Sequence, residues 1–464
     1  MREGDAPVKS APPLRDVGID APRAIVQLLG YRFQTGQRTP IMALFTAKSL
    51  AFLSAGLCAA AMLSACSNSE DAEASNDAVE DASAAAGALP GALVPGGGGG
   101  DPALQETMQE IAPEGETALS VETLAEGLVN PWGLAFLPNG DMLVTEREGR
   151  IRIIREGALV DDPVAGAPEP LVWNQGGYFD VLPHPDFAEN NILYLSYAHG
   201  TREGNATRVV RGVFDGATLS DVETIYEVTP LKDTGHHFGG RMAWGGDGRL
   251  YLTTGDGGRY QERAQDMATS FGAVVRLNED GSLPADNPTF GPGSLPELYS
   301  KGHRNPQGLV YDAGRGVLWS NEHGPRGGDE INDVQAGANY GWPAATYGIN
   351  YNGSKVTPFT EFEGARQPVK YWTPSIAPSG MAVYRGDMFA AWEGDLLVGA
   401  MADHSSQALH RVIMDANLPI GEERYLVGER IRDVRVGPDG AVYVTTEDRG
   451  GAPVGKVLRL TPRN

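Results

Sequence analysis

Two neighbouring histidines and three arginines are the side chains whose types suggest chemistry: His236, His237, Arg304, Arg430 and Arg432. The whole chain carries a formal net charge of −23, so a group of cations within it needs a reason. Arginine binds carboxylates through paired donors, and several arginines together suit a small multivalent anion. If these residues meet in space, they form a positive pocket for such an anion. If they do not meet, each belongs to a separate salt bridge.

The segment Glu322-His323-Gly324-Pro325 predicts a tight turn whose main-chain carbonyls can face one place. Hard cations such as Ca²⁺ accept carbonyl oxygens as ligands. The sequence has no EF-hand spacing and no cluster of acids that requires a metal. Its only cysteines, Cys58 and Cys66, precede the globular part. This placement excludes a disulfide framework, a cysteine-based metal site and a CxxCH haem site in that part.

A repeated β-hairpin must position these residues. From about residue 120, a short apolar strand is followed by a turn of Gly, Asp or Asn and by a second alternating strand. Turns such as Asn139-Gly140 and Asp439-Gly440 join the two strands. The six copies span residues 132–146, 178–198, 241–256, 307–324, 380–400 and 432–448. They start roughly 45 to 75 residues apart, a spacing typical of propeller blades.

The repeats predict an all-β fold, a six-bladed β-propeller with four-stranded antiparallel blades around a channel. A two-sheet sandwich and a β-helix are the alternatives, but a sandwich rarely repeats one hairpin six times. In a blade the innermost strand runs away from one rim of the propeller, and the second strand returns to it. Residues before each first strand and after each second strand therefore share that rim. They include Gln175, His236-His237, His303-Arg304-Asn305, Ser375, Arg430, Arg432, Glu322 to Pro325, Met401 to His404 and Glu447-Asp448.

The part of the chain before the repeats reads as a targeting region. Residues 1–41 predict a dispensable extension or a wrongly chosen start, and residues 42–65 predict a bacterial lipoprotein signal. Its apolar stretch ends at Leu63-Ser64-Ala65-Cys66, so Cys66 is the expected lipidated N-terminus. An ordinary signal peptide with a chance cysteine is the alternative. Residues 66–101 predict a disordered acidic and Gly-rich linker, and residues 102–464 the propeller.

The predicted location follows from this region. The protein is expected to cross the inner membrane and to stay on the periplasmic side, with the lipid anchor as its only membrane contact. The residue that follows Cys66 is Ser67 and not Asp. By resemblance to bacterial lipoproteins, in which Asp at this position favours retention at the inner membrane, Ser67 favours sorting to the outer membrane. The net charge of −23 argues against nucleic acid as a partner.

Several motifs in residues 120 to 462 resemble those of the soluble PQQ-dependent aldose and glucose dehydrogenases, the soluble quinoprotein glucose dehydrogenase family. Two stretches are specific in combination, Gly302-His303-Arg304-Asn305-Pro306-Gln307-Gly308 and Asp329-Glu330-Ile331-Asn332 followed by Asn339-Tyr340-Gly341-Trp342-Pro343. Further matches are Asn174-Gln175-Gly176-Gly177, His237-Phe238-Gly239-Gly240-Arg241, Glu322-His323-Gly324-Pro325 and Arg430-Ile431-Arg432-Asp433.

The resemblance implies oxidation of aldose sugars at C1 to the lactone, with hydride passed to PQQ and electrons delivered to an external acceptor, a quinone or a cytochrome. It implies that His237 is the general base, a role that suits an imidazole because its ordinary pKa lies near neutrality. It implies that Arg304 acts in catalysis by polarising PQQ. The other implied contacts are Arg304, Asn305, Ser375, Arg430, Arg432 and Gln175 for PQQ, Gln175 and His236 for the sugar, and the carbonyls of Gly324 and Pro325 for Ca²⁺.

Three positions depart from the family pattern. His236 stands where the glucose enzymes have an acid, as in the aldose branch, so a broader range of aldoses is expected. Met401 follows Leu396 to Ala400 where the family usually has a lysine that contacts PQQ, which bears on cofactor affinity. His323 replaces the glutamine often found before the Gly-Pro pair.

Two other functions remain open from the sequence. One is a lactonase-type propeller hydrolase, which would hold a metal with Asp, Glu and Asn side chains, whereas this rim is richer in His and Arg. The other is a non-catalytic propeller that binds carbohydrate or protein. Reduction of a dye by sugar, only after PQQ and calcium are added, separates the three functions.

Overall fold

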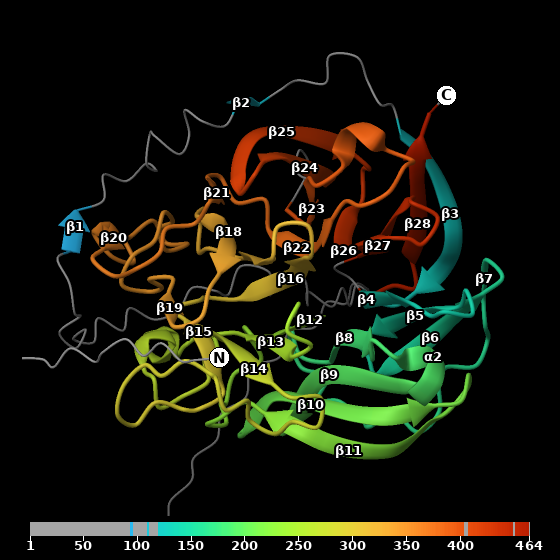
Figure 1. Cartoon of the computed structure of the whole chain (residues 1–464), viewed down its shortest axis with the longest axis horizontal. Helices are drawn as coiled ribbons and strands as arrows, with labels where there is room; N and C mark the ends of the chain where they lie inside the picture. Colours follow the sequence, from blue (N-terminus) through green and yellow to red (C-terminus); the bar gives the residue numbers. More distant parts are fainter. Residues whose placement is uncertain (1–92, 96–108, 111–118, 403–406, 449–450, 464) are drawn as a thin grey trace, which may run out of the picture. The chain divides into compact units, whose positions relative to one another are not determined.

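The computed structural model describes residues 93–95, 109–110, 119–402, 407–448 and 451–463. The expected extension, signal peptide and Cys66 lie outside these residues, as does most of the expected linker. Six antiparallel sheets surround a centre in Figure 1, so the chain is an all-β, six-bladed β-propeller. The sequence-based prediction of fold is confirmed. Within the described ranges, no helix has the length and apolar character needed to cross a membrane.

The strands of blades 1 to 3 follow each other along the chain. Blade 1 comprises β4 (Pro131–Phe136), β5 (Met142–Glu146), β6 (Arg150–Arg155) and β7 (Ala158–Leu159). Blade 2 comprises β8 (Tyr178–Pro183), β9 (Ile192–Gly200), β10 (Asn205–Phe214) and β11 (Leu219–Glu227), with the short helix α2 (Phe187–Asn190) between its first strands. Blade 3 comprises β12 (Gly239–Trp244), β13 (Leu250–Thr254), β14 (Ala273–Leu277) and β15 (Leu298–Lys301), with the 3-10 turn η2 (Gln261–Gln265).

Blades 4 to 6 complete the ring. Blade 4 comprises β16 (Pro306–Asp312), β17 (Val317–Glu322), β18 (Asp329–Val334) and β21 (Lys370–Trp372). Blade 5 comprises β22 (Pro378–Val383), β23 (Leu396–Ala400), β24 (Ala408–Asp415) and β25 (Leu418–Leu426), with the 3-10 turn η3 (Ala390–Trp392). Blade 6 comprises β26 (Arg430–Val436), β27 (Val442–Glu447), β28 (Gly455–Pro462) and β3 (Leu119–Leu128).

Four short strands lie outside this four-per-blade pattern. β19 (Ala338–Asn339) pairs parallel with β15, and β2 (Gln109–Glu110) pairs parallel with β25. β20 (Phe359–Phe362) pairs with β1 (Leu93–Pro95), a strand within the segment expected to be a linker. β19 and β2 thus extend the outer edges of blades 3 and 5, and β1 and β20 form a separate two-stranded sheet.

The six predicted hairpins are the first two strands of the six blades. Each innermost strand also packs against its two neighbours in the order β4, β8, β12, β16, β22, β26 and back to β4. The starts of these strands and the ends of the second strands therefore surround one opening, as the repeat pattern predicts.

Blade 6 is built from both ends of the propeller. Its outermost strand, β3, pairs antiparallel with β28, from Leu119 opposite Pro462 to Leu128 opposite Gly455. Blade 6 thus takes three strands from the end of the chain and one from its beginning. This pairing closes the ring.

Every innermost strand is irregular near its first residues. The register with the second strand shifts once in each blade, between Pro131 and Leu134 in blade 1 and between Ile431 and Asp433 in blade 6, for example. The other four blades show the same shift. A bulge of this kind redirects the side chains beside it. All six blades therefore depart from strict alternation at the rim.

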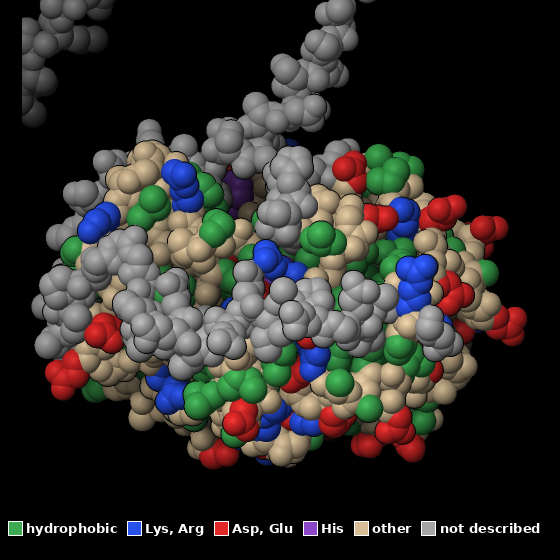
Figure 2. Space-filling view, turned by 90° about the horizontal axis from the view of Figure 1, so that it is seen from above, with side chains coloured by type: hydrophobic (Ala, Val, Ile, Leu, Met, Phe, Trp, Pro, Cys, Tyr) green, Lys and Arg blue, Asp and Glu red, His purple; other side chains and the backbone are tan. Residues whose placement is uncertain are grey.

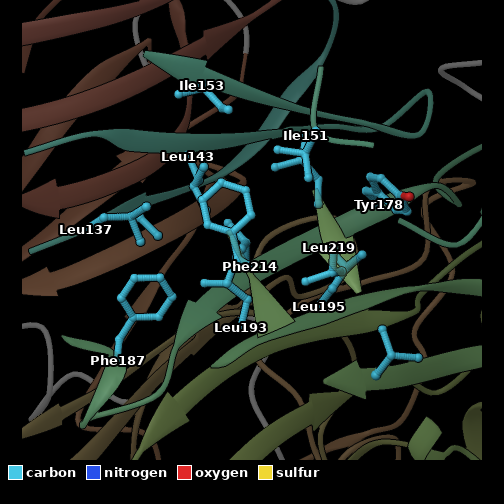
Figure 3. Packing of buried hydrophobic residues seen from close by; sticks show 14 of the residues in the cluster. Leu137, Leu143, Ile151, Ile153, Tyr178, Phe187, Leu193, Leu195, Phe214 and Leu219 are labelled. Carbon is cyan, nitrogen blue, oxygen red and sulfur yellow. The ribbon is translucent and has the colours of Figure 1, made fainter. Parts of the chain in front are cut away.

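The hydrophobic core lies between neighbouring blades. Between blades 1 and 2, side chains from both sheets interdigitate, and Figure 3 shows 14 residues of this cluster. Leu143 of β5 is 0% exposed and Leu195 of β9 is 1% exposed. Burying a leucine of this kind contributes about 1.5–3 kcal/mol. Figure 2 shows charged and apolar side chains interspersed over one outer face.

A buried ionic network links blades 2, 3 and 6 near the propeller axis. The Arg241 guanidinium of β12 lies 3.1 Å from Asp180 of β8 and 3.1 Å from Asp433 of β26. Arg435 lies 3.0 Å from the same Asp180 and 3.1 Å from the same Asp433. Because each carboxylate serves two arginines, no charge in this network is left unpaired.

Candidate functional site at the propeller rim

The starts of the innermost strands enclose a cavity of about 220 Å³, called the central cavity here. All six blades contribute to its lining: Trp132, Arg147, Gln175, Phe179, Phe238, Gly239, Asn305, Gln307, His323, Ala377, Met401, Arg430, Arg432 and Glu447. The structure thus brings together four residues selected from the sequence, Gln175, Asn305, Arg430 and Arg432.

Arg430 and Arg432 of β26 are separated by one residue and reach the same cavity. Side chains two positions apart lie on the same face of a strand, and both arginines line the central cavity although the register shifts between Ile431 and Asp433. Arg430 donates to the main-chain carbonyl of Met401, and Arg432 Nη1 lies 3.3 Å from the sulfur of the same methionine.

The charged side chains that line the central cavity, Arg147, Arg430, Arg432 and Glu447, are called the arginine cluster here. Burial and the repulsion between its arginines change the pKa of Arg432. Burial lowers the pKa of Arg432 to about 10, and Glu447 acts in the opposite direction. Arg241, Arg147 and Arg430 add repulsion that also lowers it. The Arg432 guanidinium lies 4.7 Å from the centre of the Trp132 ring, a cation–π contact. The arginine cluster remains cationic at neutral pH and lacks full compensation.

Among the buried donors of the described residues that have no hydrogen-bond partner are the Nε atoms of three arginines at this rim, Arg304, Arg430 and Arg432. An unsatisfied buried N–H is costly, and it acquires a partner when a ligand supplies an acceptor. Arg430 and Arg432 line the central cavity, so the acceptor most suited to them is an anion with several oxygens.

His237 is held by a buried carboxylate. Its Nδ1 lies 2.6 Å from Asp256 Oδ1, and the two side chains are 5% and 1% exposed. Asp256 also accepts hydrogen bonds from Trp342 Nε1 at 2.7 Å and from the Gly258 N–H at 2.7 Å. With Nδ1–H donated to the carboxylate, Nε2 carries the lone pair and can accept a proton.

The backbone around His237 is fixed by a second loop. His237 has φ +50°, a left-handed conformation that a non-glycine residue adopts at some cost. Its N–H donates to Gln175 Oε1 at 2.8 Å, and the Gln175 N–H donates to the Gly235 carbonyl at 2.9 Å. His237 does not itself line the central cavity, but its neighbours Phe238 and Gly239 do.

His323 is a neutral residue in the lining of the central cavity. Its Nε2 lies 2.8 Å from the carbonyl of Pro378, which makes Nε2 the protonated nitrogen. Burial, reinforced by Arg432 and Arg304, lowers the pKa of His323 to about 3. At neutral pH His323 therefore presents the lone pair of Nδ1 among cationic neighbours.

Arg304 donates a hydrogen bond to the carbonyl of Gly324, one of the two carbonyls at which the resemblance implies calcium. Its Nη1 donates to the Gly324 carbonyl at 2.8 Å, and its backbone N–H donates to Glu322. Arg304, His323 and Gly324 line a small cavity of about 10 Å³ beside the central one. A cation does not fit against this carbonyl while the guanidinium is there, because the two positive charges repel each other.

Four other candidates have different surroundings. The Ser375 hydroxyl donates to Asp329 at 2.6 Å, and Ser375 does not line the central cavity. Burial raises the pKa of Asp329 to about 6, against the effect of the Ser375 hydrogen bond. Pro325 is buried, and His236 is half-buried beside Gly258. Asn305 accepts at 3.2 Å from the Gly239 N–H through Oδ1.

The structure adds residues that were not selected from the sequence. Asp256 lies two residues after the second strand of blade 3, near the rim position where Glu322 and Glu447 end the second strands of blades 4 and 6. That position was the available signal for Asp256. Arg147 follows the second strand of blade 1 and lines the central cavity for the same topological reason.

No cluster of three or more His, Cys, Asp or Glu side chains in the described ranges is arranged to hold a metal ion. A metal at this rim would depend on main-chain carbonyls, as the resemblance implies for Gly324 and Pro325.

Comparison with known proteins gives consistent matches. A family model described as Glucose / Sorbosone dehydrogenase matches residues 128–459. Aldose sugar dehydrogenase YliI of Escherichia coli is 41% identical over 358 residues, covering 75% of this chain and 94% of that protein. Quinoprotein glucose dehydrogenase B of Acinetobacter calcoaceticus is 29% identical over 414 residues, covering 71% and 85%. The structure of the PQQ-bound aldose sugar dehydrogenase from Streptomyces coelicolor matches at 29% identity and TM-score 0.61, covering 75% of this chain and 99% of that chain.

Proposed function

The chain belongs to the Glucose / Sorbosone dehydrogenase family, and from that premise we propose that it oxidises aldose sugars at C1 to the lactone, with PQQ bound in the central cavity. Membership supports sugar dehydrogenase activity in general. The aldose substrate and PQQ are suggested by the relatives named aldose sugar dehydrogenase and quinoprotein glucose dehydrogenase. An external quinone or cytochrome is the proposed electron acceptor.

One observation carries the proposal: unsatisfied arginine donors and a histidine–aspartate pair lie at the same rim. PQQ is a flat tricarboxylate, and the Nε atoms of Arg304, Arg430 and Arg432 are buried donors without partners in the described chain. The donor set therefore fits PQQ. Arg430 and Arg432 would pair with its carboxylates, and Arg304 and Asn305 would hold its carbonyl edge. When bound, PQQ supplies the acceptor for the hydride that leaves C1.

The protein's own contribution to the chemistry is a proton acceptor in a fixed orientation. His237 Nε2 is proposed to take the proton of the C1 hydroxyl. Asp256 holds the opposite nitrogen at 2.6 Å and stabilises the imidazolium that results. The side-chain oxygen of Gln175 accepts a hydrogen bond from the backbone N–H of His237. This contact fixes the left-handed backbone of His237 and therefore the position of its imidazole ring. His236, on the neighbouring position, is proposed to contact the sugar.

Two implied contacts need rearrangement or another role. The Ser375 hydroxyl is already donated to Asp329, so its contact with PQQ requires a change of partner. Calcium at the carbonyls of Gly324 and Pro325 requires Arg304 to leave the Gly324 carbonyl. We therefore propose calcium only for the PQQ-loaded protein, in which Arg304 has another acceptor, and derive no step through it.

Reconstitution tests the proposed function. The cofactor-free protein is titrated with PQQ in the presence of calcium, and reduction of an electron-acceptor dye by aldoses is measured. Saturable activity that requires PQQ is expected. A protein that binds PQQ without reducing the dye would instead be a non-catalytic propeller. Opening of a lactone without PQQ would identify a hydrolase.

For location, we propose a periplasmic lipoprotein anchored at Cys66. The support is the sequence of residues 42–66 alone.

A further inference from the structure

Glu447 is a carboxylate inside the cavity that is proposed to bind a carboxylate ligand. It ends strand β27 and lines the central cavity together with Arg147, Arg430 and Arg432. Glu447 Oε1 lies 3.1 Å from Arg430 Nη2, and Oε2 lies 3.9 Å from Arg432 Nε. The two arginines that would hold an incoming anion therefore already share one internal anion.

The charge of Glu447 is stabilised by these arginines. Burial alone would raise its pKa, but Arg432, Arg430 and Arg147 outweigh burial and hold the pKa below its usual range. Glu447 is thus ionised at neutral pH. It compensates one of three neighbouring positive charges and satisfies only part of their donors, since the Nε atoms of Arg430 and Arg432 have no hydrogen-bond partner in the described chain.

A second space adjoins this carboxylate. A cavity of about 560 Å³, called the side cavity here, shares Arg430 and Glu447 with the central cavity. It is also lined by Glu429 and by Lys456, whose Nζ lies 2.6 Å from Glu429 Oε1. Glu447 therefore lines both cavities. The side cavity, which Arg432 does not line, offers room beside the carboxylate, and it is also lined by the acids Glu126, Glu429 and Asp448 and by Lys456, which is already paired with Glu429.

We propose that Glu447 is a built-in counter-anion: it neutralises Arg430 and Arg432 in the ligand-free protein, and an entering carboxylate displaces it toward the side cavity. The identity of the ligand as PQQ rests on the proposed function. The competing role is a permanent positioning residue, called the strut here: Glu447 stays bound to the arginines and orients them for the ligand. The two roles predict opposite changes in affinity when the charge of Glu447 is removed.

The test compares two variants that each remove one negative charge at this rim. Glu447→Gln keeps the size of the side chain beside the arginines. Glu429→Gln is the matched control, because Glu429 is the next residue to Arg430 and lines the side cavity but contacts Lys456 and Thr446. For each protein, the Kd for PQQ is measured by titration of the cofactor-free form, and the Tm of that form is measured with and without sodium sulfate.

A counter-anion predicts three results. The Kd of Glu447→Gln for PQQ falls about tenfold, the scale of one like charge removed within a few ångströms. Its Tm without ligand falls, because three arginines lose their compensation. Sulfate restores its Tm more than it raises that of the wild type, since the arginines then accept the added anion. Glu429→Gln shows neither the tighter binding nor the greater response to sulfate.

An unchanged or higher Kd for PQQ in Glu447→Gln overturns the proposal in favour of the strut. If the wild type binds no PQQ, the proposed function fails, and sulfate then decides the inference separately. A larger gain of Tm in Glu447→Gln than in the wild type supports the counter-anion, and equal gains overturn it.

Discussion

The imidazole of His237 and the carboxylate of Asp256 lie 2.6 Å apart, and each has a second anchor in a different part of the rim. Asp256 accepts from Trp342 Nε1, and His237 donates its backbone N–H to Gln175. The pair is therefore fixed from two sides before any substrate binds. A proton acceptor held in this way loses little orientation freedom in the reaction.

Replacing the orienting carboxylate tests this relationship. Asp256→Asn keeps the shape but removes the charge that favours Nδ1–H and stabilises the imidazolium. We expect kcat to fall at least about tenfold, and by less than in His237→Ala, while the Kd for PQQ is unchanged. Steady-state kinetics with PQQ at saturation measures the effect. A normal kcat would show that Asp256 serves packing alone.

The two histidines are separated by their kinetic effects. His237→Ala is expected to lower kcat by at least about 10²–10⁴-fold, the usual contribution of a positioned general base. PQQ should still bind, because the arginines remain. His236→Ala, the matched neighbour, is expected to change mainly the KM and the preference among aldoses. A larger loss of kcat in His236→Ala than in His237→Ala contradicts the assignment of the base.

Arg432 is a direct ligand-binding candidate because it lines the central cavity and its buried Nε has no hydrogen-bond partner among the described residues. Arg432→Ala is expected to weaken PQQ binding by about 1.5–3 kcal/mol, the scale of a charge-assisted hydrogen bond. Titration of the cofactor-free variant, followed by absorbance, gives the Kd. Arg155→Ala, at a half-exposed arginine that pairs with Asp141 in blade 1, is the control and should bind PQQ normally. An unchanged Kd in Arg432→Ala removes this residue from the site.

The contact between Arg304 and the Gly324 carbonyl leads us to expect that calcium binding, if calcium is held at this carbonyl, depends on PQQ. Calcium alone is expected to leave the Tm of the cofactor-free protein unchanged, because the guanidinium occupies the carbonyl. With PQQ present, calcium should raise the Tm, and a chelator should reverse the rise. Thermal unfolding under the four combinations checks this. Stabilisation by calcium without PQQ would mean that the cation binds elsewhere or displaces Arg304 unaided.

Cysteine substitution tests the anchor. Cys66→Ser is expected to move the protein from the membrane fraction to the soluble fraction. Cys58→Ser, at the other cysteine of the same segment, should leave it with the membranes. Wild-type protein that already fractionates as soluble contradicts the lipoprotein prediction.

The inner half of each blade is predictable from the sequence because its signals are local. A hairpin such as residues 432–448 carries its alternation and its Asp439-Gly440 turn within a few residues. Strand β3 carries no comparable signal for its place in blade 6. It pairs with β28 from the opposite end of the propeller, and only the closed ring brings the two together.

The sequence predicts which side chains lie at the rim of the propeller, but it does not predict the hydrogen-bond partners of these side chains. Gln175 and Arg430 could be placed at the rim from strand topology alone. Ser375 donates to Asp329, and Arg304 donates to the Gly324 carbonyl. These pairings depend on how loops from blades 4 and 5 pack, and the spacing of residues in the sequence does not indicate that packing. Asp256 was predictable by analogy with Glu322 and Glu447, because all three acids lie at or just after the end of a second strand.

The pairing of β3 with β28 also has a consequence for biosynthesis. Strand β3 leaves the ribosome first, and its partner follows roughly 340 residues later, a delay of about 20–70 s at typical rates of synthesis. Until then the ring is open and the hydrogen-bonding edge of β3 has no partner from β28. Premature termination before Gly455 would therefore cost the molecule its closure, and every blade would lose the support of a complete ring.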